Sequence, residues 1–236
     1  MKKIINYIIM LLIGCFCMAC SKEPLKNDKE VVMLIDESDP LRLKPDADEI
    51  SSQLGLKQDI WQGIKVLITY ISDKDINTEK VISLEKAAML SGNKQLRTLQ
   101  VEHFKKELRA ALSGAHTSGS LNNSIIYRTV ARHLNELSAS TAKSKYLMLY
   151  SDLMENDEIS FYNPATLSLL RTHPDVIRQR LERTIKLRNL TGIQVWLLYE
   201  PKSFNENNTY MAAANLYKQM LEAKGATVHI ANTLNL

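Results

Sequence analysis

Short apolar runs recur along most of the chain and are separated by longer amphipathic stretches. The clearest runs are continuous and β-favouring, and they occupy 31–35, 64–71, 146–150, 193–199 and 227–231. Runs of this length without regular polar positions are typical of strands buried on both faces of a parallel sheet. A weaker run at 80–84 predicts either an edge strand or the start of a helix that continues to Leu90.

Helical periodicity fills most of the intervals between these runs. Helices are predicted within 45–61, at 94–112, at about 121–137, from Pro174 to about 190, and at 208–224. Residues that commonly start or end helices stand at several of these boundaries. Pro45 suits a helix start, Ser120 is a good N-cap and Gly225 ends the last helix. Buried strands that alternate with amphipathic helices predict an α/β fold, a doubly wound and mostly parallel sheet with helices on both faces.

The N-terminus has the plan of a bacterial export signal. Lys2 and Lys3 give a positive start, 4–16 is largely apolar, and Ala19 precedes Cys20. This order is typical of a secretory signal peptide, and the apolar run is shorter than the roughly 20 residues of a membrane-spanning helix. The Ala19-Cys20 junction resembles the lipobox of bacterial lipoproteins, although Cys17 stands where that motif usually has Leu. The resemblance implies cleavage after residue 19 and a lipid on Cys20; an ordinary cleaved signal or an uncleaved anchor is the alternative.

The rest of the chain divides into a short tether and one domain. Residues 20–30 are mostly polar and contain Pro24, as expected of a tether between lipid and protein. Residues 31–236 are long enough to bury a core as a single α/β domain. Ser21 after the lipidated cysteine resembles the outer-membrane version of the bacterial sorting rule. The expected location is therefore the cell envelope, with the anchor in the outer membrane.

The positions of the cysteines exclude thiol chemistry in the domain, and its charge argues against nucleic-acid binding. The three cysteines lie at positions 15, 17 and 20, so the domain itself contains none and has no thiol nucleophile, disulfide or thiolate-ligated zinc. The formal net charge is +4, and loss of Lys2 and Lys3 with the signal peptide lowers it by two to +2. A nearly neutral domain argues against nucleic-acid binding, which normally needs a concentrated basic face.

Polar side chains gather where strands end or helices begin. Asp36 and Ser38 follow the first strand, Ser120 precedes a helix, and Asp152 follows the strand at 146–150. In an open parallel sheet, binding sites form at the carboxyl ends of the strands. Carboxylate and hydroxyl oxygens are hard donors that suit Mg²⁺, Mn²⁺ or Ca²⁺ and suit zinc or copper poorly.

These residues resemble the von Willebrand factor type A domain family, over most of residues 31–236. That family has a metal-ion-dependent adhesion site on the rim of a doubly wound sheet, and its first motif is Asp-x-Ser-x-Ser. The stretch here is Asp36-Glu37-Ser38-Asp39-Pro40. A Thr in a Gly-rich turn and an Asp that closes the central strand complete the family pattern. Ser120 and Asp152 stand at these two places, so the resemblance implies that a cation is held by Asp36, Ser38, Ser120 and Asp152.

One position departs from the family pattern. Pro40 replaces a serine, so one hydroxyl ligand is missing from the implied site. Neighbouring residues with side-chain oxygens are the candidates to replace it, and they are Glu37, Asp39, Thr117 and Ser118. A cation site needs enough oxygen ligands in suitable geometry, so the alternative is a rim whose polar residues only finish turns.

The favoured function is a binding, adhesion or assembly module rather than an enzyme. The resemblance implies a protein partner in the envelope whose carboxylate completes the coordination of the cation, while the lipid on Cys20 holds the protein at the membrane. One alternative is a metal-dependent phosphoryl hydrolase or nuclease in which Asp36, Asp152 and Asp157 bind Mg²⁺. Another is a structural accessory lipoprotein without a metal. No catalytic residues are assigned in the favoured interpretation.

Overall fold

The computed structural model describes residues 27–38, 40–71, 77–90, 92–113 and 124–236. The predicted signal peptide and Cys20 lie outside these ranges. Six strands form one sheet in the order β3-β2-β1-β4-β5-β6. The strands are β1 (Lys29–Asp36), β2 (Ile64–Ile71), β3 (Glu79–Leu84), β4 (Ser144–Tyr150), β5 (Ile193–Leu198) and β6 (Thr227–Ala231). All neighbours run parallel except β2 and β3, which are antiparallel.

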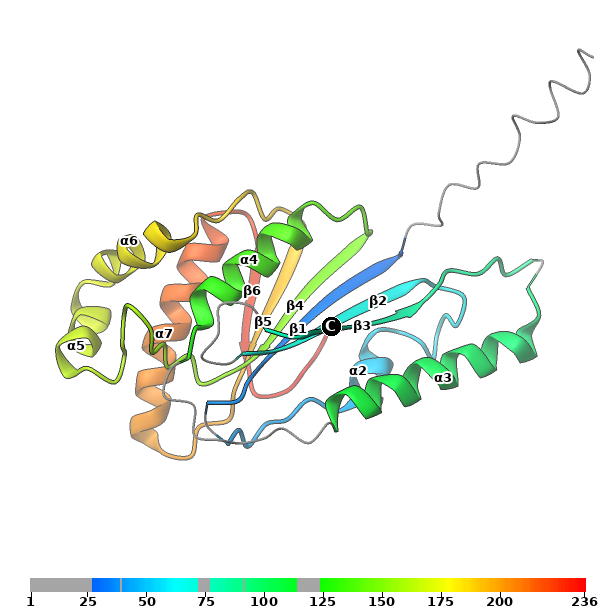
Figure 1. Ribbon diagram of the computed structural model, residues 1–236, viewed down its shortest axis with the longest axis horizontal. Coiled ribbons are helices and arrows are strands. Elements are labelled where there is room, and N and C mark those ends of the chain that lie inside the picture. The colour runs from blue at the N-terminus through cyan, green and yellow to red at the C-terminus, as the bar shows by residue number, and fades with distance from the viewer. Residues whose placement is uncertain (1–26, 39, 72–76, 91, 114–123) are drawn as a thin grey trace, which may run out of the picture.

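Helices cover both faces of this sheet (Figure 1). They are α2 (Ala47–Gln53), α3 (Lys94–Leu112), α4 (Ile126–Ser138), α5 (Pro164–Thr172), α6 (Pro174–Thr184) and α7 (Phe204–Glu222). Residues of α2 and α3 belong to one hydrophobic core, and residues of α4, α6 and α7 belong to the other. The predicted α/β fold with a mostly parallel, doubly wound sheet is thereby confirmed. Within the described residues, no helix is both long and apolar enough to cross a membrane.

The central strand β1 contributes to both cores. Val32 and Leu34 pack on the α4 face, while Val31, Met33 and Ile35 pack on the α2 and α3 face. Successive side chains of a strand point to opposite faces, so a strand covered on both sides is apolar throughout. Each fully buried side chain of this kind stabilises the fold by about 1.5–3 kcal/mol. The continuous apolar run at 31–35 therefore results from double burial.

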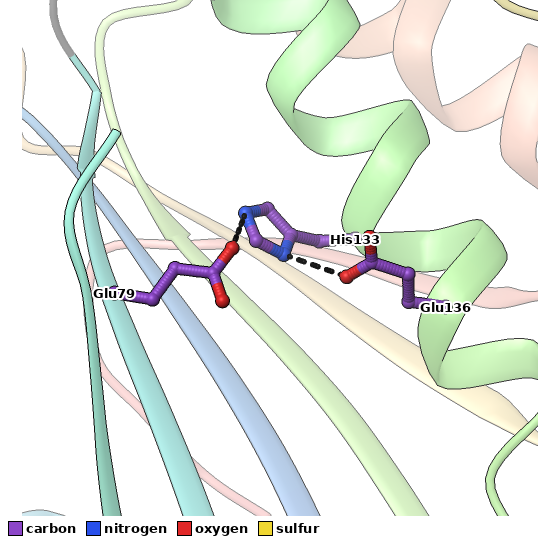
Figure 2. Close-up of side chains that lie close together, drawn as sticks. All are labelled: Glu79, His133 and Glu136. Carbon is purple, nitrogen blue, oxygen red and sulfur yellow. Dashed lines mark ion pairs between the residues drawn. The ribbon is translucent and has the colours of Figure 1, made fainter. Parts of the chain in front are cut away.

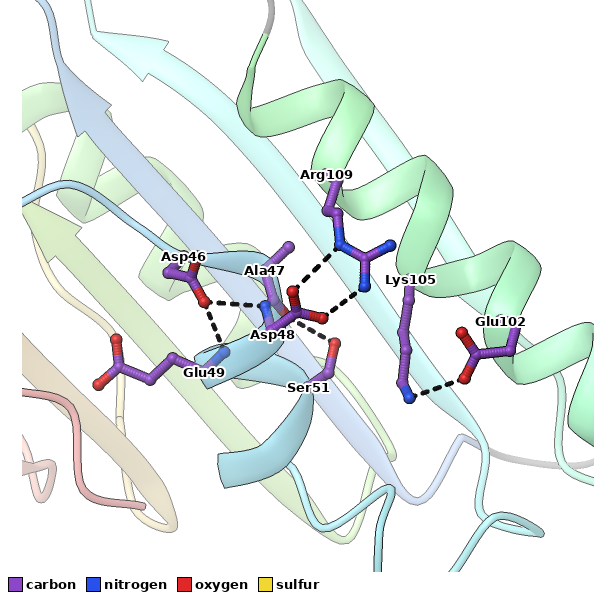
Figure 3. A network of polar contacts seen from close by, with 8 residues as sticks. All are labelled: Asp46, Ala47, Asp48, Glu49, Ser51, Glu102, Lys105 and Arg109. Carbon is purple, nitrogen blue, oxygen red and sulfur yellow. Dashed lines mark hydrogen bonds and ion pairs between the residues drawn. The ribbon is translucent and has the colours of Figure 1, made fainter.

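A polar network fixes the short helix α2 against α3 (Figure 3). The side chain of Asp46 caps α2, because it accepts hydrogen bonds from the amides of Asp48 and Glu49 at 3.0 and 2.7 Å. Arg109 of α3 forms an ion pair with Asp48 at 2.6 Å. This pair is exposed and therefore screened by solvent, so the cap contributes more to the start of the helix.

The structure corrects several predicted boundaries. The segment 80–84 lies within the antiparallel edge strand β3, which decides between the two predicted alternatives, and α2 lies within the predicted range 45–61. The helix predicted at 121–137 begins at Ile126, and Ile125 occupies the N-cap position for which Ser120 is the predicted residue. The helix predicted to reach about 190 ends at Thr184. Helix α5 was not predicted, because Leu170 is its one buried residue and its apolar pattern is weak.

Candidate functional site

Asp36 is the last residue of β1 and lies in register with Ile71 of β2. Alternation along the strand places its side chain on the α4 face, the face of Val32 and Leu34. The residue is only 3 % exposed. A buried carboxylate is costly unless polar groups surround it, so the contacts of Asp36 decide what the rim can do.

Three serine hydroxyls surround the Asp36 carboxylate. Ser38 Oγ donates to Oδ1 at 2.7 Å, and the Ser38 amide donates to the same oxygen at 3.0 Å. Ser151 Oγ donates to Oδ2 at 2.7 Å. Ser124 Oγ lies 3.3 Å from Oδ1 and 3.5 Å from Oδ2. We call Asp36, Ser38, Ser124 and Ser151 the serine ring; its members come from the end of β1, the segment before α4 and the end of β4.

The serine ring offers hard oxygen atoms around one negative charge. Hydrogen bonds to a charged acceptor are worth about 1.5–3 kcal/mol each, which offsets the burial of Asp36. A serine hydroxyl is both a donor and an acceptor, so rotation about its C–O bond can direct a lone pair to a cation. Four oxygen-bearing side chains at the carboxyl edge of a parallel sheet therefore have the chemistry of a Mg²⁺, Mn²⁺ or Ca²⁺ site.

Asp152 lies at the same edge but faces a different space. Asp36 is the last residue of β1, and Asp152 follows the neighbouring parallel strand β4. It is Ser151, however, whose side chain contacts Asp36, while Asp152 accepts a hydrogen bond from the Met154 amide at 2.8 Å. Asp152 also lines a cavity of about 300 Å³ whose other walls include Tyr199, Lys202, Glu206 and Tyr210.

The other predicted rim residues are distributed as follows. Those outside the described residues are Asp39, Thr117, Ser118 and Ser120. Glu37 continues the line of β1, and its amide donates to Ile71 O at 3.3 Å. Ser124, four positions beyond Ser120, is the serine from this part of the chain that reaches Asp36. The expected helix start at residue 121 concealed it, because a serine inside a helix would have no reason to face the rim.

Glu155 is a second buried acid at the rim, and sequence analysis missed it. Its carboxylate accepts hydrogen bonds from the amides of Ile126 and Tyr127 at 3.2 and 2.8 Å, and from the Tyr217 hydroxyl at 3.3 Å. Ile125 precedes α4 without any side-chain cap, so Glu155 takes the role of the cap. Burial raises the pKa of Glu155 to about 8, although these hydrogen bonds favour the charged form.

The turn that carries Ser151 and Glu155 is strained. Leu153 has a φ of 61°, in the left-handed region that residues other than glycine rarely occupy. Such a conformation costs about 1–3 kcal/mol and persists only when its surroundings impose it. The Leu153 amide donates to Ser151 Oγ at 2.9 Å, and the Leu153 side chain is fully buried. The same hydroxyl thus holds the turn and contacts Asp36.

Asp157, the third acid of the hydrolase alternative, is paired with a cation. Its Oδ2 accepts a hydrogen bond from Arg128 of α4 at 2.7 Å. Both side chains are partly buried, with 19 % of Asp157 and 25 % of Arg128 exposed. The arginine balances the charge that would otherwise attract Mg²⁺, so this acid is better described as a support of α4.

Comparisons with known proteins identify no family for this chain. No family model matches it, and no curated protein matches it. Among solved structures, it is similar to an aspartate-to-alanine mutant of the PilB minor pilin from Streptococcus sanguinis, with a TM-score of 0.41 and 10 % sequence identity. The match covers 91 % of this chain and 59 % of that chain, so this chain spans less than two thirds of the pilin's length. At this level of similarity the match leaves the function open.

Proposed function

We propose that this protein is an envelope binding module that engages a protein partner through the serine ring, with a divalent cation between them. The observation that carries the proposal is the meeting of three serine hydroxyls from separate segments at the buried Asp36 carboxylate. Local turn formation explains Ser38, which is two residues from Asp36. It does not explain Ser124 and Ser151, which are 88 and 115 residues away in the chain.

In the proposed mechanism, the serine ring holds the cation on its protein side. Asp36 supplies the negative charge, and the serine hydroxyls turn their lone pairs to the ion or to its bound water. The ring carries one carboxylate, so much of the cation's charge remains unbalanced. A carboxylate from a partner protein is the group that best completes the coordination. We also propose, as part of this function, that the domain is related to the von Willebrand factor type A family.

The direction of β1 supports a role at a membrane surface. The predicted lipid attachment, Cys20, precedes β1, which begins at Lys29 and ends at Asp36. An eight-residue strand is on the order of 23 Å long, at about 3.3 Å per residue. The serine ring is therefore at the edge of the sheet opposite to the start of β1. An outer-membrane anchor at Cys20 would leave this rim accessible to a partner.

Cation titration tests the proposal. The purified full chain is treated with a chelator, and its thermal unfolding is followed with increasing Mg²⁺, Mn²⁺ or Ca²⁺. A cation that binds the folded state raises the unfolding temperature by mass action. Asp36→Asn and Ser151→Ala should each remove this rise. Asp157→Asn, which alters a nearby acid outside the serine ring, is the matched control and should keep it.

Two results would overturn the proposal. If no hard cation stabilises the wild type, the serine ring is structural and the protein is better described as a metal-free accessory lipoprotein. If Asp157→Asn abolishes the response and the protein hydrolyses a generic phosphodiester, the acidic residues form an enzyme site. Retention of an envelope protein that is lost with EDTA and with Asp36→Asn would extend the cation result to a partner.

A further inference from the structure

A buried histidine outside the serine ring lies on the α4 face of the sheet. His133 lies in α4 and is 1 % exposed. Neither of its ring nitrogens has a hydrogen-bond partner among the described residues. A buried polar group left in this state costs about 1–3 kcal/mol, and such groups in folded proteins normally have a reason. The surroundings of the ring supply one.

Two glutamates direct their carboxylates at this ring (Figure 2). Glu79, at the start of the edge strand β3, places Oε1 3.8 Å from His133 Nε2. Glu136, one turn further along α4, places Oε2 3.5 Å from His133 Nδ1. Both distances exceed a normal hydrogen bond. The groups face each other with a gap between them, and one ligand atom from each residue lies within 4.8 Å of the others.

The cluster combines one buried imidazole with two exposed carboxyl groups. An imidazole nitrogen is the commonest metal ligand in proteins. The two glutamates are 40 % and 59 % exposed, so their side chains have room to change torsion angles. The buried imidazole ring thus lies between the two carboxylates, with one carboxylate at each of its nitrogens.

We propose that Glu79, His133 and Glu136 bind one divalent transition-metal ion, most favourably Zn²⁺, which fastens the edge strand β3 to α4. An imidazole with two carboxylates suits zinc, whereas Mg²⁺ and Ca²⁺ prefer oxygen ligands alone. Tetrahedral zinc with bonds of about 2.0–2.1 Å places its ligand atoms about 3.3 Å apart. Because the ion takes one ring nitrogen, the glutamate at the other nitrogen must turn towards it, from a starting arrangement in which the ligand atoms lie within 4.8 Å of one another.

Neighbouring groups provide the remaining parts of such a site. Thr69 of β2 lies opposite Glu79 in the antiparallel register, so the two side chains share a face. Its hydroxyl is fully buried and has no hydrogen-bond partner among the described residues, and it can orient Glu79 or a water on the metal. A groove of about 430 Å³, lined in part by His133 and Glu136, leads to the cluster from solvent. Water from the groove would fill the open coordination position.

The experiment is a Zn²⁺ titration of the chelator-treated full chain, by calorimetry and by thermal unfolding. The wild type should bind a single equivalent with a Kd in the micromolar range or tighter, and its unfolding temperature should rise. Glu79→Gln and Glu136→Gln should each weaken binding by at least about tenfold, since even outer-shell groups affect metal affinity that strongly. Both glutamates are substantially exposed, so these variants should fold. With Co²⁺ in place of Zn²⁺, the visible absorption of a low-coordinate ion should appear in the wild type and weaken in both variants.

A matched control is available on α3. His103 and Glu107 form an exposed pair at 3.5 Å, which could bind zinc adventitiously. Glu107→Gln should leave the zinc affinity unchanged, and so should Asp36→Asn, which tests the serine ring separately. The inference is wrong if the wild type binds no zinc, if Glu79→Gln and Glu136→Gln bind it as tightly as the wild type, or if Glu107→Gln abolishes binding. None of these results bears on the response of the serine ring to Mg²⁺, Mn²⁺ or Ca²⁺.

Discussion

The Glu155 carboxylate accepts a 2.8 Å hydrogen bond from the amide of Tyr127, in the first turn of α4. The acid comes from the turn after β4, so it joins the rim to the helix that packs over β1. It is 2 % exposed. Because burial favours its neutral form, this cap carries a pH dependence that an exposed capping residue would not have.

We expect Glu155 to make the protein less stable as the pH rises from about 5 to 7.5. Its pKa is 4.5 unperturbed and about 8 when folded, so the folded state holds more protons in this interval. Its contribution is full below pH 4.5 and is lost as the pH approaches 8. The loss over the interval should be about 2–4 kcal/mol, at about 1.4 kcal/mol per unit of pKa difference.

The measurement is urea unfolding of the wild type and Glu155→Gln at several pH values. The glutamine cannot ionise, so the wild type should lose stability relative to the variant as the pH rises. His133 acts in the opposite direction, since its lowered pKa makes stability fall as the pH drops from 6.5 towards 4. This contribution cancels in the difference between the two proteins. A difference that does not change with pH would show that Glu155 is charged throughout.

Ser151→Ala should lower the free energy of unfolding by about 2–3 kcal/mol even without metal. The substitution removes the 2.7 Å hydrogen bond to Asp36 and the acceptor of the Leu153 amide. The buried Asp36 carboxylate and the strained turn at Leu153 thus both lose the Ser151 hydroxyl as their hydrogen-bond partner. Ser113→Ala, which removes an exposed hydroxyl bonded to a helix carbonyl, should change stability by less than about 0.5 kcal/mol. Equal effects of the two substitutions would contradict this account of the rim.

Arg97→Met should destabilise the protein by about 3 kcal/mol or more. Arg97 is 2 % exposed, and its guanidinium donates to the carbonyls of Ile60, Gln62 and Glu85 at 2.5–2.8 Å. The methionine fills part of the volume but leaves these carbonyls without a donor. Arg109→Met is the control, because the exposed Arg109–Asp48 pair is screened by solvent and its loss should change stability much less than the loss of Arg97. Chemical unfolding of both variants gives the comparison.

Cys20→Ser should abolish lipid attachment, and Cys17→Ser should preserve it. In the lipobox interpretation, Cys20 receives the lipid, whereas Cys17 is removed with the signal peptide. Metabolic labelling with a fatty acid, followed by detergent phase separation, distinguishes the two variants in a bacterial host. Labelling of the Cys20→Ser protein would refute the interpretation, and absence of label from the wild type would refute it as well.

Some features of this protein were determined by the sequence alone. The apolar runs at 31–35 and 64–71 predicted buried parallel strands, and 94–112 and 227–231 were predicted with the boundaries that the structure has for α3 and β6. These features can be predicted from the sequence because burial gives the apolar residues a period of two in strands and of 3.6 in amphipathic helices. The carboxyl edge of the sheet could also be named as the place where polar residues collect, since parallel strands share that edge.

The partners of the polar residues were decided only by the tertiary structure. The sequence could place Asp36 and Asp152 at one edge, but not reveal that Ser124 and Ser151 contact Asp36, that Glu155 caps α4, or that Glu79 meets His133. Each of these contacts joins residues from different elements, and the local pattern of apolar and polar residues carries no information about such contacts. A buried polar group takes whichever partner the packing of distant segments brings within hydrogen-bond distance, so the chemistry of these sites is a property of the fold.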